Sequence, residues 1–238
     1  MIKMAETKKC IEYIYLKSDD ISKYKNHIFV IPIGSIEQHC GLPLGLDSII
    51  ISKIASDLCK VMNDVIIMPT IYYGFSPEWY NAKGTITLDM ETFSGIIKSI
   101  LNSIAKFGGK KIVFLNGHGG NSYILESVLR EWISNNSETI ILLINYWKVL
   151  NINIGHAGNV EKSIAKALNI NIEESECNGK IDLYNGNAKI IVSGPKEESK
   201  TQEINEINLN HDDIILKIKE EIIKALNFVN EESGSFIL

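Results

Sequence analysis

The stretch IFVIPIGSIEQHCGLPLGLD, residues 28–47, decides how the rest of the chain is interpreted. Its first six residues, Ile28–Ile33, are apolar and largely β-branched, which predicts a buried strand that ends at a glycine turn. Two side chains of the metal-binding type, Glu37 and His39, follow this strand. In an extended segment, residues two apart point to the same side, so these two face one way and Gln38 faces the other. We therefore predict a metal-ligand loop where the strand ends.

Asp47 stands just before a helical pattern and offers a further oxygen ligand from a loop-to-helix junction. Apolar residues at positions 50, 51, 54, 58, 61 and 62 mark one face of a helix over 49–62. Each of these polar residues also has an ordinary interpretation. Asp47 is placed to cap the helix, Glu37 to be a solvated loop acid, and His39 to be a hydrogen-bonded loop histidine. The pair of Glu37 and His39 is therefore a weak signal on its own. The other histidines of the chain decide whether a metal site is predicted.

The composition indicates one domain over residues 1–238 that acts on small molecules. The chain has 238 residues, of which 45% are hydrophobic, and no linker rich in Pro, Gly or Ser divides it. A net charge of -5 and a pI near 5.6 give no electrostatic footprint for nucleic acid. Arg130 is the single arginine, so no cluster of arginines is available to hold a heavily phosphorylated substrate.

The cysteines and the apolar runs point to a cytoplasmic protein. The four cysteines are scattered without a CxxC spacing, which indicates neither a disulfide framework nor a structural zinc site; they are Cys10, Cys40, Cys59 and Cys177. We expect Cys59 to be a small core residue of the helix over 49–62. The first ten residues are polar, and no apolar run reaches 18 residues, so no membrane association is expected.

Apolar runs and helical patterns alternate along the chain. Strands are predicted over 28–33, 64–71, 111–115 and 139–144. Helices are predicted over 49–62, 90–107, 122–133, 159–168 and 212–232, with a long loop over 72–88, a hairpin over 179–195 and a surface loop over 196–210. This order predicts an α/β fold with a mainly parallel sheet and helices on both faces. Ligands bind such sheets beyond the carboxyl ends of the strands.

Three of the five histidines lie at glycine-rich turns: His39, His118 in NGHGGN, and His156 in GHAGNVE. Glycines beside His118 allow the backbone to approach a ligand closely, and Asn116 and Asn121 are suited to hold that loop by hydrogen bonds. Glu161 lies near the start of the helix over 159–168, where a carboxylate either offsets the helix dipole or acts as a further ligand.

Together these residues supply two imidazoles and three carboxylates, from Glu37, His39, Asp47, His118 and Glu161. Such donors suit zinc, manganese or iron(II). One metal rarely needs five protein ligands, whereas two metals about 3.5 to 4 Å apart, bridged by one carboxylate, would use them all. The sequence therefore predicts two divalent metal ions.

The motifs EQH, LPLGLD, YGFSPE, GTITL, NGHGGN and GHAGxxE, in this order and spacing, resemble those of the creatininase (creatinine amidohydrolase) family. The resemblance covers nearly the whole chain. It implies a three-layer α/β/α domain, a dinuclear metal centre and often a homohexamer, so a homo-oligomer is expected. The implied reaction is hydrolysis of a non-peptide carbon–nitrogen bond in a small-molecule amide, cyclic amide or formamide.

The resemblance also implies roles for single residues. Asp47 would bridge the two metals, Glu37 and His118 would hold one of them, and His39 and Glu161 the other. The two residues expected to be catalytic are Glu161, through this ligand role, and His156, as the acid that protonates the departing nitrogen.

The sequence departs from the family pattern at several places, among them Trp79, where relatives often carry histidine, and Lys162, where the usual ETS reads EKS. The loop before Asp47 is one residue shorter and lacks a second histidine, and Gly120 stands where creatininases proper carry a carboxylate. Creatinine is therefore not the expected substrate, and the pattern is nearer to relatives that open formamide or lactam groups. Two alternatives remain open: a relative that has lost turnover and serves as a binding or assembly subunit, and a mycofactocin-type peptidase, which needs an open groove.

Overall fold

The computed structural model describes residues 10–181, 194–201 and 207–231. The strands are β1 (Ile11–Glu12), β2 (Ile28–Ile33), β3 (Val65–Ile67), β4 (Lys111–Asn116), β5 (Ile140–Asn145), β6 (Lys180–Ile181) and β7 (Lys200–Thr201). The helices are α1 (Leu46–Val61), α2 (Met90–Lys106), α3 (Asn121–Ile133), α4 (Tyr146–Val149), α5 (Asn159–Ala167) and α6 (His211–Glu231), with 3-10 helices η1 (Tyr13–Tyr15), η2 (Ser18–Tyr24) and η3 (Pro77–Trp79). None of the helices in these ranges combines the length and the low polarity needed to cross a membrane.

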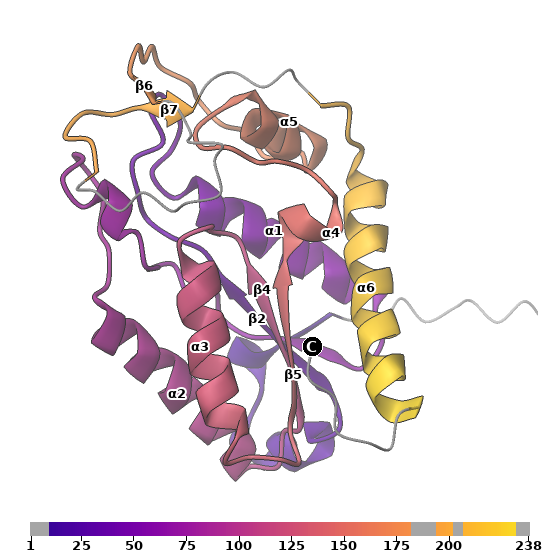
Figure 1. Cartoon of the computed structure of the whole chain (residues 1–238). Helices are drawn as coiled ribbons and strands as arrows, with labels where there is room; N and C mark the ends of the chain where they lie inside the picture. Colours follow the sequence, from indigo (N-terminus) through magenta and orange to yellow (C-terminus); the bar gives the residue numbers. More distant parts are fainter. Residues whose placement is uncertain (1–9, 182–193, 202–206, 232–238) are drawn as a thin grey trace, which may run out of the picture.

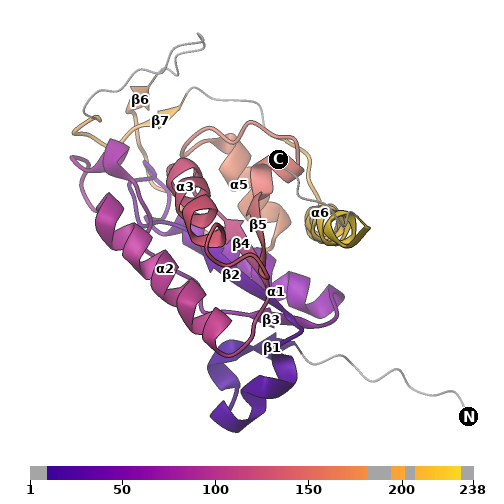
Figure 2. The ribbon, with the colours of Figure 1, turned by 60° about the horizontal axis from the view of Figure 1, so that its bottom comes forward.

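The centre of the molecule is a five-stranded parallel sheet in the order β1-β3-β2-β4-β5. Strands β2, β4 and β5 of this sheet are labelled in Figure 1. Helices α2 and α3 cover one face of the sheet, and α1 and α6 cover the other, as Figure 2 shows. This arrangement confirms the predicted three-layer α/β/α fold. The expectation that residues 1–238 form a single domain stays a prediction.

Alternate residues of each central strand pack into different layers. In β2, Val30 points into the layer of α1, α5 and α6, whereas Phe29 and Ile31 point into the layer of α2 and α3. Strands that are buried on both faces need an unbroken apolar sequence, which explains the continuous runs that predicted β2 and β4. Asp89 caps α2 as expected, because its side chain accepts a hydrogen bond from Thr92 N at 2.7 Å.

Several predicted boundaries differ from the structure. Helix α1 begins at Leu46, so Asp47 lies in its first turn and not before it. The strand predicted over 64–71 is regular only at β3, and β1 was not predicted because two residues carry no periodic signal. Most of the predicted hairpin over 179–195 lies outside the described residues. The surface loop predicted over 196–210 is wrong in part, because β7 pairs there with β6.

The cysteines form two disulfides, Cys10–Cys59 and Cys40–Cys177, which contradicts the prediction of no disulfide framework. The partners are 49 and 137 residues apart, so a search for local spacings could not find them. The first disulfide joins the chain just before β1 to α1. The second joins the loop that follows β2 to the segment just before β6.

Candidate metal centre

The five predicted metal ligands lie together near the carboxyl ends of β2 and β4, and all of them are buried. The loop after β2 supplies Glu37 and His39, and the loop after β4 supplies His118. Asp47 comes from the first turn of α1, and Glu161 comes from the first turn of α5. This position agrees with the rule that ligand sites of parallel sheets lie beyond the carboxyl ends of the strands.

The donor atoms form two groups that share Asp47. His118 Nδ1 lies 3.3 Å from Glu37 Oε1 and 3.0 Å from Asp47 Oδ2. His39 Nε2 lies 3.3 Å from Asp47 Oδ1 and 3.7 Å from Glu161 Oε1. Within each group of three residues, the donor atoms lie within 4.8 Å of one another. Asp47 therefore presents one carboxylate oxygen to each group.

Hydrogen bonds from neighbouring residues hold these donors in place. Ser35 Oγ donates to Asp47 Oδ2 at 2.7 Å. The side chain of Asn116 binds both backbone groups of His118 in the NGHGGN loop. Its NH₂ group donates to His118 O at 2.8 Å, and its oxygen accepts from His118 N at 3.1 Å. Asn121 donates to Gly34 O at 3.0 Å and so ties this loop to the end of β2. The predicted role of the two asparagines is confirmed.

Close backbone packing also restricts the loop after β4. A Cβ atom at Gly117 would lie 2.8 Å from Asp47 O, which is closer than real side chains allow. The glycine therefore lets the loop of His118 approach the first turn of α1.

The site has unpaired buried atoms that suit a cation. Glu37 Oε2, His39 Nε2 and Glu161 Oε2 have no hydrogen-bond partner among the described residues. Buried polar atoms without a partner are costly, and the two carboxylate oxygens among these three atoms favour a compensating positive charge. Oxygen and imidazole nitrogen donors are the ligands that zinc, manganese and iron(II) accept. The residues present therefore fit the divalent metals that the sequence predicts.

The electrostatics of the cluster favour positive charge. Burial, with Asp47 adding to it, raises the pKa of Glu37 to about 7, although His118 opposes the shift. Burial opposes charge on His118, but Glu37 and Asp47 outweigh it and raise the pKa of His118 to about 9. Burial likewise works against the charge on Asp47, yet His39 and His118 hold the pKa of Asp47 well below its usual range. The raised pKa values of Glu37 and His118 favour protonation of both groups when no metal is bound.

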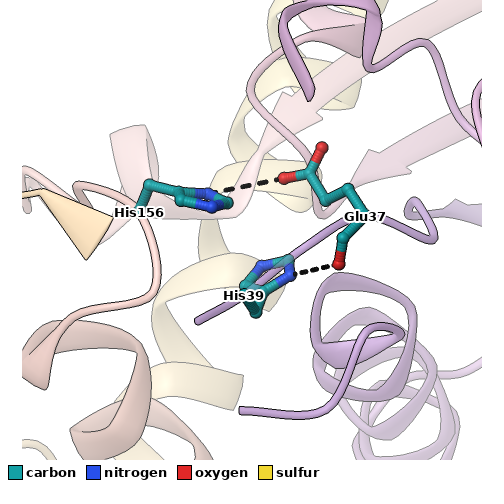
Figure 3. A group of neighbouring side chains, drawn as sticks. All are labelled: Glu37, His39 and His156. Atoms are coloured by element: carbon teal, nitrogen blue, oxygen red, sulfur yellow. Dashed lines mark hydrogen bonds and ion pairs between the residues drawn. The ribbon is translucent and has the colours of Figure 1, made fainter. Parts of the chain in front are cut away.

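His156 lies beside these two groups, in the loop between α4 and α5. Its Nδ1 is 3.5 Å from Glu37 Oε1, and a dashed line marks this contact in Figure 3. The imidazole stacks on Trp79 with ring centroids 4.2 Å apart and an interplanar angle of 20°. Burial, and to a smaller degree His39, lowers the pKa of His156 to about 3, so the ring is neutral at physiological pH.

A cavity of about 250 Å³ opens onto the donor cluster. Its walls include the aromatic and aliphatic side chains of Trp79, Trp147, Ile154 and Ile181. A larger groove, of about 610 Å³, runs along β5, but no predicted ligand lines it. Among the described residues, neither lysine nor arginine lines the smaller cavity.

Sequence reasoning missed several residues of the site. Ser35 stands two residues before the EQH motif and Gln38 stands inside it, but no local signal assigns a partner to either side chain. Tyr146 is buried after β5, where burial and the nearby carboxylate of Glu161 raise the pKa of its hydroxyl. Its position at a strand end is the one signal that would have drawn attention to it.

Comparison with curated proteins finds relatives that hydrolyse different substrates. The creatinine amidohydrolase of Pseudomonas putida is 24% identical over 131 residues, which cover 50% of this chain and 50% of that protein. The mycofactocin precursor peptide peptidase of Mycobacterium tuberculosis is 35% identical over 102 residues, which cover 39% of this chain and 40% of the peptidase. The chain thus spans no more than about half the length of either relative.

Comparison of the fold and of the sequence pattern leads to one family. A crystal structure of creatinine amidohydrolase (creatininase) superposes with a TM-score of 0.73 at 15% identity, covering 95% of this chain and 100% of that one. At that identity the likeness is one of fold. The family model described as creatininase, creatinine amidohydrolase, matches residues 15–172, which is more than half of the chain. On this evidence the chain belongs to the creatininase family.

Proposed function

We propose that this protein is a metal-dependent hydrolase of a non-peptide carbon–nitrogen bond in a small amide, cyclic amide or formamide. The observation that carries the proposal is the pair of donor groups that share Asp47 at the base of a cavity. The three buried donor atoms without partners support metal binding at this place. Membership of a family that contains a creatinine amidohydrolase supports a hydrolase.

In the proposed centre, two divalent ions of zinc, manganese or iron would share Asp47 as a ligand. Glu37 and His118 would hold one ion, and His39 and Glu161 would hold the other. When bound, such ions supply Lewis acidity and an activated water for attack on a carbonyl. Glu161 is catalytic through this ligand role.

The remaining residues of the cavity bind and orient the substrate. Trp79 and Trp147 offer flat apolar surfaces on which a planar amide or lactam can stack. His156 lines the same cavity, with its ring held against Trp79. These side chains also exclude bulk water, which strengthens hydrogen bonds made to the substrate.

The size of the cavity favours this proposal over the peptidase alternative. Pockets for drug-sized ligands usually measure about 300 to 1,000 Å³, and this one, at about 250 Å³, suits a smaller molecule. The shortened loop before Asp47 was the reason to consider a subunit without turnover. All five donors nevertheless converge, which favours a working centre.

Elemental analysis and a substrate panel test the proposal. Protein purified without chelator should contain about two divalent metals per chain and should hydrolyse a member of a panel of amides, lactams and formamides. The variants His118→Ala and Asp47→Ala should lose metal and activity. Glu131→Gln, at an exposed position on α3, is the matched control and should keep both. A fully metallated protein that is inert on the whole panel contradicts the proposal.

The homo-oligomer, with a hexamer as the form that the resemblance implies, and the cytoplasmic location stay predictions. Light scattering of the purified protein tests the first, and fractionation of the source cells tests the second.

A further inference from the structure

The three histidines of the site, His39, His118 and His156, differ in the partner of the ring nitrogen that points away from the cluster of donor atoms. A neutral imidazole has one nitrogen that carries a hydrogen and one that carries a lone pair. Only the nitrogen with the lone pair binds a metal. The hydrogen-bond partner of the other nitrogen determines which of the two carries the hydrogen. The hydrogen-bond partners therefore sort the histidines into metal ligands and hydrogen-bond donors.

Two of the histidines are arranged as ligands. His39 Nδ1 lies 3.0 Å from Glu37 O, and because a carbonyl oxygen only accepts, this nitrogen carries the hydrogen. The lone pair of His39 is then on Nε2, which has no hydrogen-bond partner among the described residues and faces the carboxylates of Asp47 and Glu161. In the same way, His118 Nε2 donates toward Phe75 O at 3.2 Å, which leaves the lone pair of His118 on Nδ1, facing Glu37 and Asp47.

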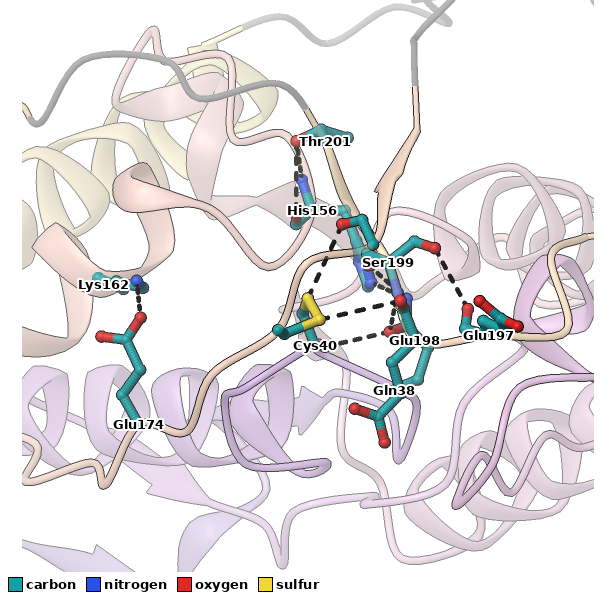
Figure 4. The surroundings of a disulfide bond; sticks show 11 residues. Gln38, Cys40, His156, Lys162, Glu174, Glu197, Glu198, Ser199 and Thr201 are labelled. Atoms are coloured by element: carbon teal, nitrogen blue, oxygen red, sulfur yellow. Dashed lines mark hydrogen bonds and ion pairs between the residues drawn. A yellow bond between two sulfur atoms is a disulfide. The ribbon is translucent and has the colours of Figure 1, made fainter.

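The orientation of the Gln38 side chain is determined by its backbone partners. Its oxygen accepts hydrogen bonds from Cys40 N at 3.0 Å and from Ser199 N at 2.9 Å. Backbone N–H groups only donate, so the oxygen and not the NH₂ group must stand there. The NH₂ group therefore points the other way. It donates one hydrogen to Ser199 O at 2.8 Å and the other to His156 Nε2 at 2.7 Å (Figure 4).

His156 is consequently arranged as a donor. Because its Nε2 accepts the hydrogen bond from Gln38, the ring hydrogen is on Nδ1, the atom that faces Glu37 across the cavity. Thr201 fixes the backbone of the same residue, since His156 N donates to Thr201 Oγ1 at 2.9 Å and Thr201 N donates to His156 O at 3.0 Å. Stacking on Trp79 restricts the rotation of the ring.

The distances alone would allow His156 to be a metal ligand, a cationic acid or a neutral hydrogen-bond donor. The hydrogen bond from Gln38 distinguishes between these three roles. His156 belongs to a third group of metal-type donors, with Glu37 and His39, so its position would allow a ligand role. A ligand would need the lone pair on Nδ1 and a hydrogen on Nε2, where it would meet the hydrogen of the Gln38 amide. A cationic, doubly protonated ring, as required of the acid expected from the resemblance, meets the same conflict.

We propose that Gln38 is a positioning residue that keeps His156 neutral with its hydrogen on Nδ1, so that His156 donates a hydrogen bond to the substrate carbonyl oxygen. This inference rests on the proposed function for the identity of the substrate group, and it replaces the role of proton donor to the departing nitrogen. The hydrogen stays on His156 throughout. A donor aimed at a carbonyl oxygen that gains charge is worth about 100-fold to 1,000-fold in kcat.

The decisive experiment is nitrogen-15 NMR of histidine-labelled, zinc-loaded protein. The chain has five histidines, and His156→Gln identifies the signals of His156 by their loss. We expect a hydrogen on Nδ1 of His156 and none on Nε2, with no metal-linked shift when zinc is added, whereas the signals of His39 and His118 move. A hydrogen on Nε2 of His156, a doubly protonated ring, or zinc-dependent shifts of His156 Nδ1 would each overturn the inference.

The variant Gln38→Glu tests the positioning role with almost the same shape. A carboxylate only accepts, so it should draw the hydrogen of His156 to Nε2 and invert the NMR pattern. We expect kcat on the best panel substrate to fall about 100-fold or more with KM little changed. An unchanged tautomer in a folded Gln38→Glu protein argues that Gln38 does not set it.

A second pair of variants tests the donor role of His156. In His156→Asn, the side-chain NH₂ group can stand near the place of Nδ1–H, whereas His156→Ala has no donor. We expect His156→Asn to keep at least about tenfold more kcat than His156→Ala. Equal losses would overturn the donor role. The NMR result does not depend on activity. A protein that shows the expected tautomer but hydrolyses no panel substrate would therefore contradict the proposed function and leave the tautomer assignment standing.

Discussion

Ser35 Oγ donates a 2.7 Å hydrogen bond to Asp47 Oδ2, the same carboxylate oxygen that lies 3.0 Å from His118 Nδ1. The bond joins the turn after β2 to the first turn of α1. It holds the carboxylate so that Oδ1 remains directed toward His39, at 3.3 Å. The geometry of both donor groups thus depends on one serine hydroxyl.

Removing that hydroxyl should weaken metal binding. Hydrogen-bond partners of metal ligands typically contribute about 10-fold to 100-fold in affinity, and we expect a loss in this range for Ser35→Ala. Competition with a chromophoric chelator measures it. Ser94→Ala, at a half-buried serine of α2 whose hydroxyl donates to Met90 O of the same helix, is the control and should bind like the wild type. Equal affinities of the two variants would count against the role of Ser35.

Metal binding should release protons and weaken as the pH falls. The pKa of Glu37 is raised to about 7 and that of His118 to about 9, so at neutral pH the metal-free site holds protons on these groups. Ligands must lose their protons to bind, so lowering the pH favours the metal-free form. Calorimetric titration with zinc in buffers of different ionisation enthalpy should give buffer-dependent heats. Heats that do not depend on the buffer would contradict the expectation.

The contact between α1 and the start of α6 should depend on pH. His211 Nε2 lies 2.8 Å from the buried carboxylate of Asp57, which also pairs with Lys53 and Lys60. Neighbouring Asp212 and Asp57 raise the pKa of His211. Burial opposes charge on Asp57, but hydrogen bonds from Lys53, Lys60 and His211 outweigh it and lower the pKa of Asp57 to about 2.

The signs of these shifts set the pH window. A histidine whose pKa is raised by folding contributes its full stabilisation below about pH 6.5. This stabilisation is lost as the pH rises through the pKa of the histidine in the folded protein. An aspartate whose pKa is lowered by folding contributes its full stabilisation above about pH 3.9. For Asp57 this stabilisation is lost as the pH falls through about 2. His211→Gln should therefore lower Tm by about 2 to 4 °C at pH 5.5 and by less at pH 9. A loss that is the same at both values would contradict the role of protonated His211.

The disulfides should be detectable and should stabilise the protein. Peptide mapping without reductant should recover Cys10 linked to Cys59 and Cys40 linked to Cys177. A disulfide typically contributes about 2 to 4 kcal/mol, so Cys177→Ser should lower Tm by about 5 to 10 °C in the absence of reductant. In reductant the variant and the wild type should melt together. Recovery of unlinked cysteine peptides from untreated protein would contradict the pairing.

Local patterns were sufficient to predict most of the regular structure. The continuous apolar runs predicted β2 and β4, and the apolar stripes predicted α2 and α6 to within a residue or two at each end. Polar donors directly after strands were sufficient to predict that Glu37, His39 and His118 meet, because the carboxyl ends of parallel strands share one edge of a sheet. These features follow from periodicity and chain order, which a single sequence contains.

The sequence by itself determined the α/β architecture and named the five residues that the structure brings together at the candidate site. Only the tertiary structure decided which distant groups contact one another: Gln38 bonds His156 and Ser199, 118 and 161 residues away, and Cys40 pairs with Cys177. The physical reason is the range of the interactions. Periodicity reports on a residue's own helix or strand, whereas a hydrogen bond between remote side chains depends on how the whole core packs, and no local pattern records it.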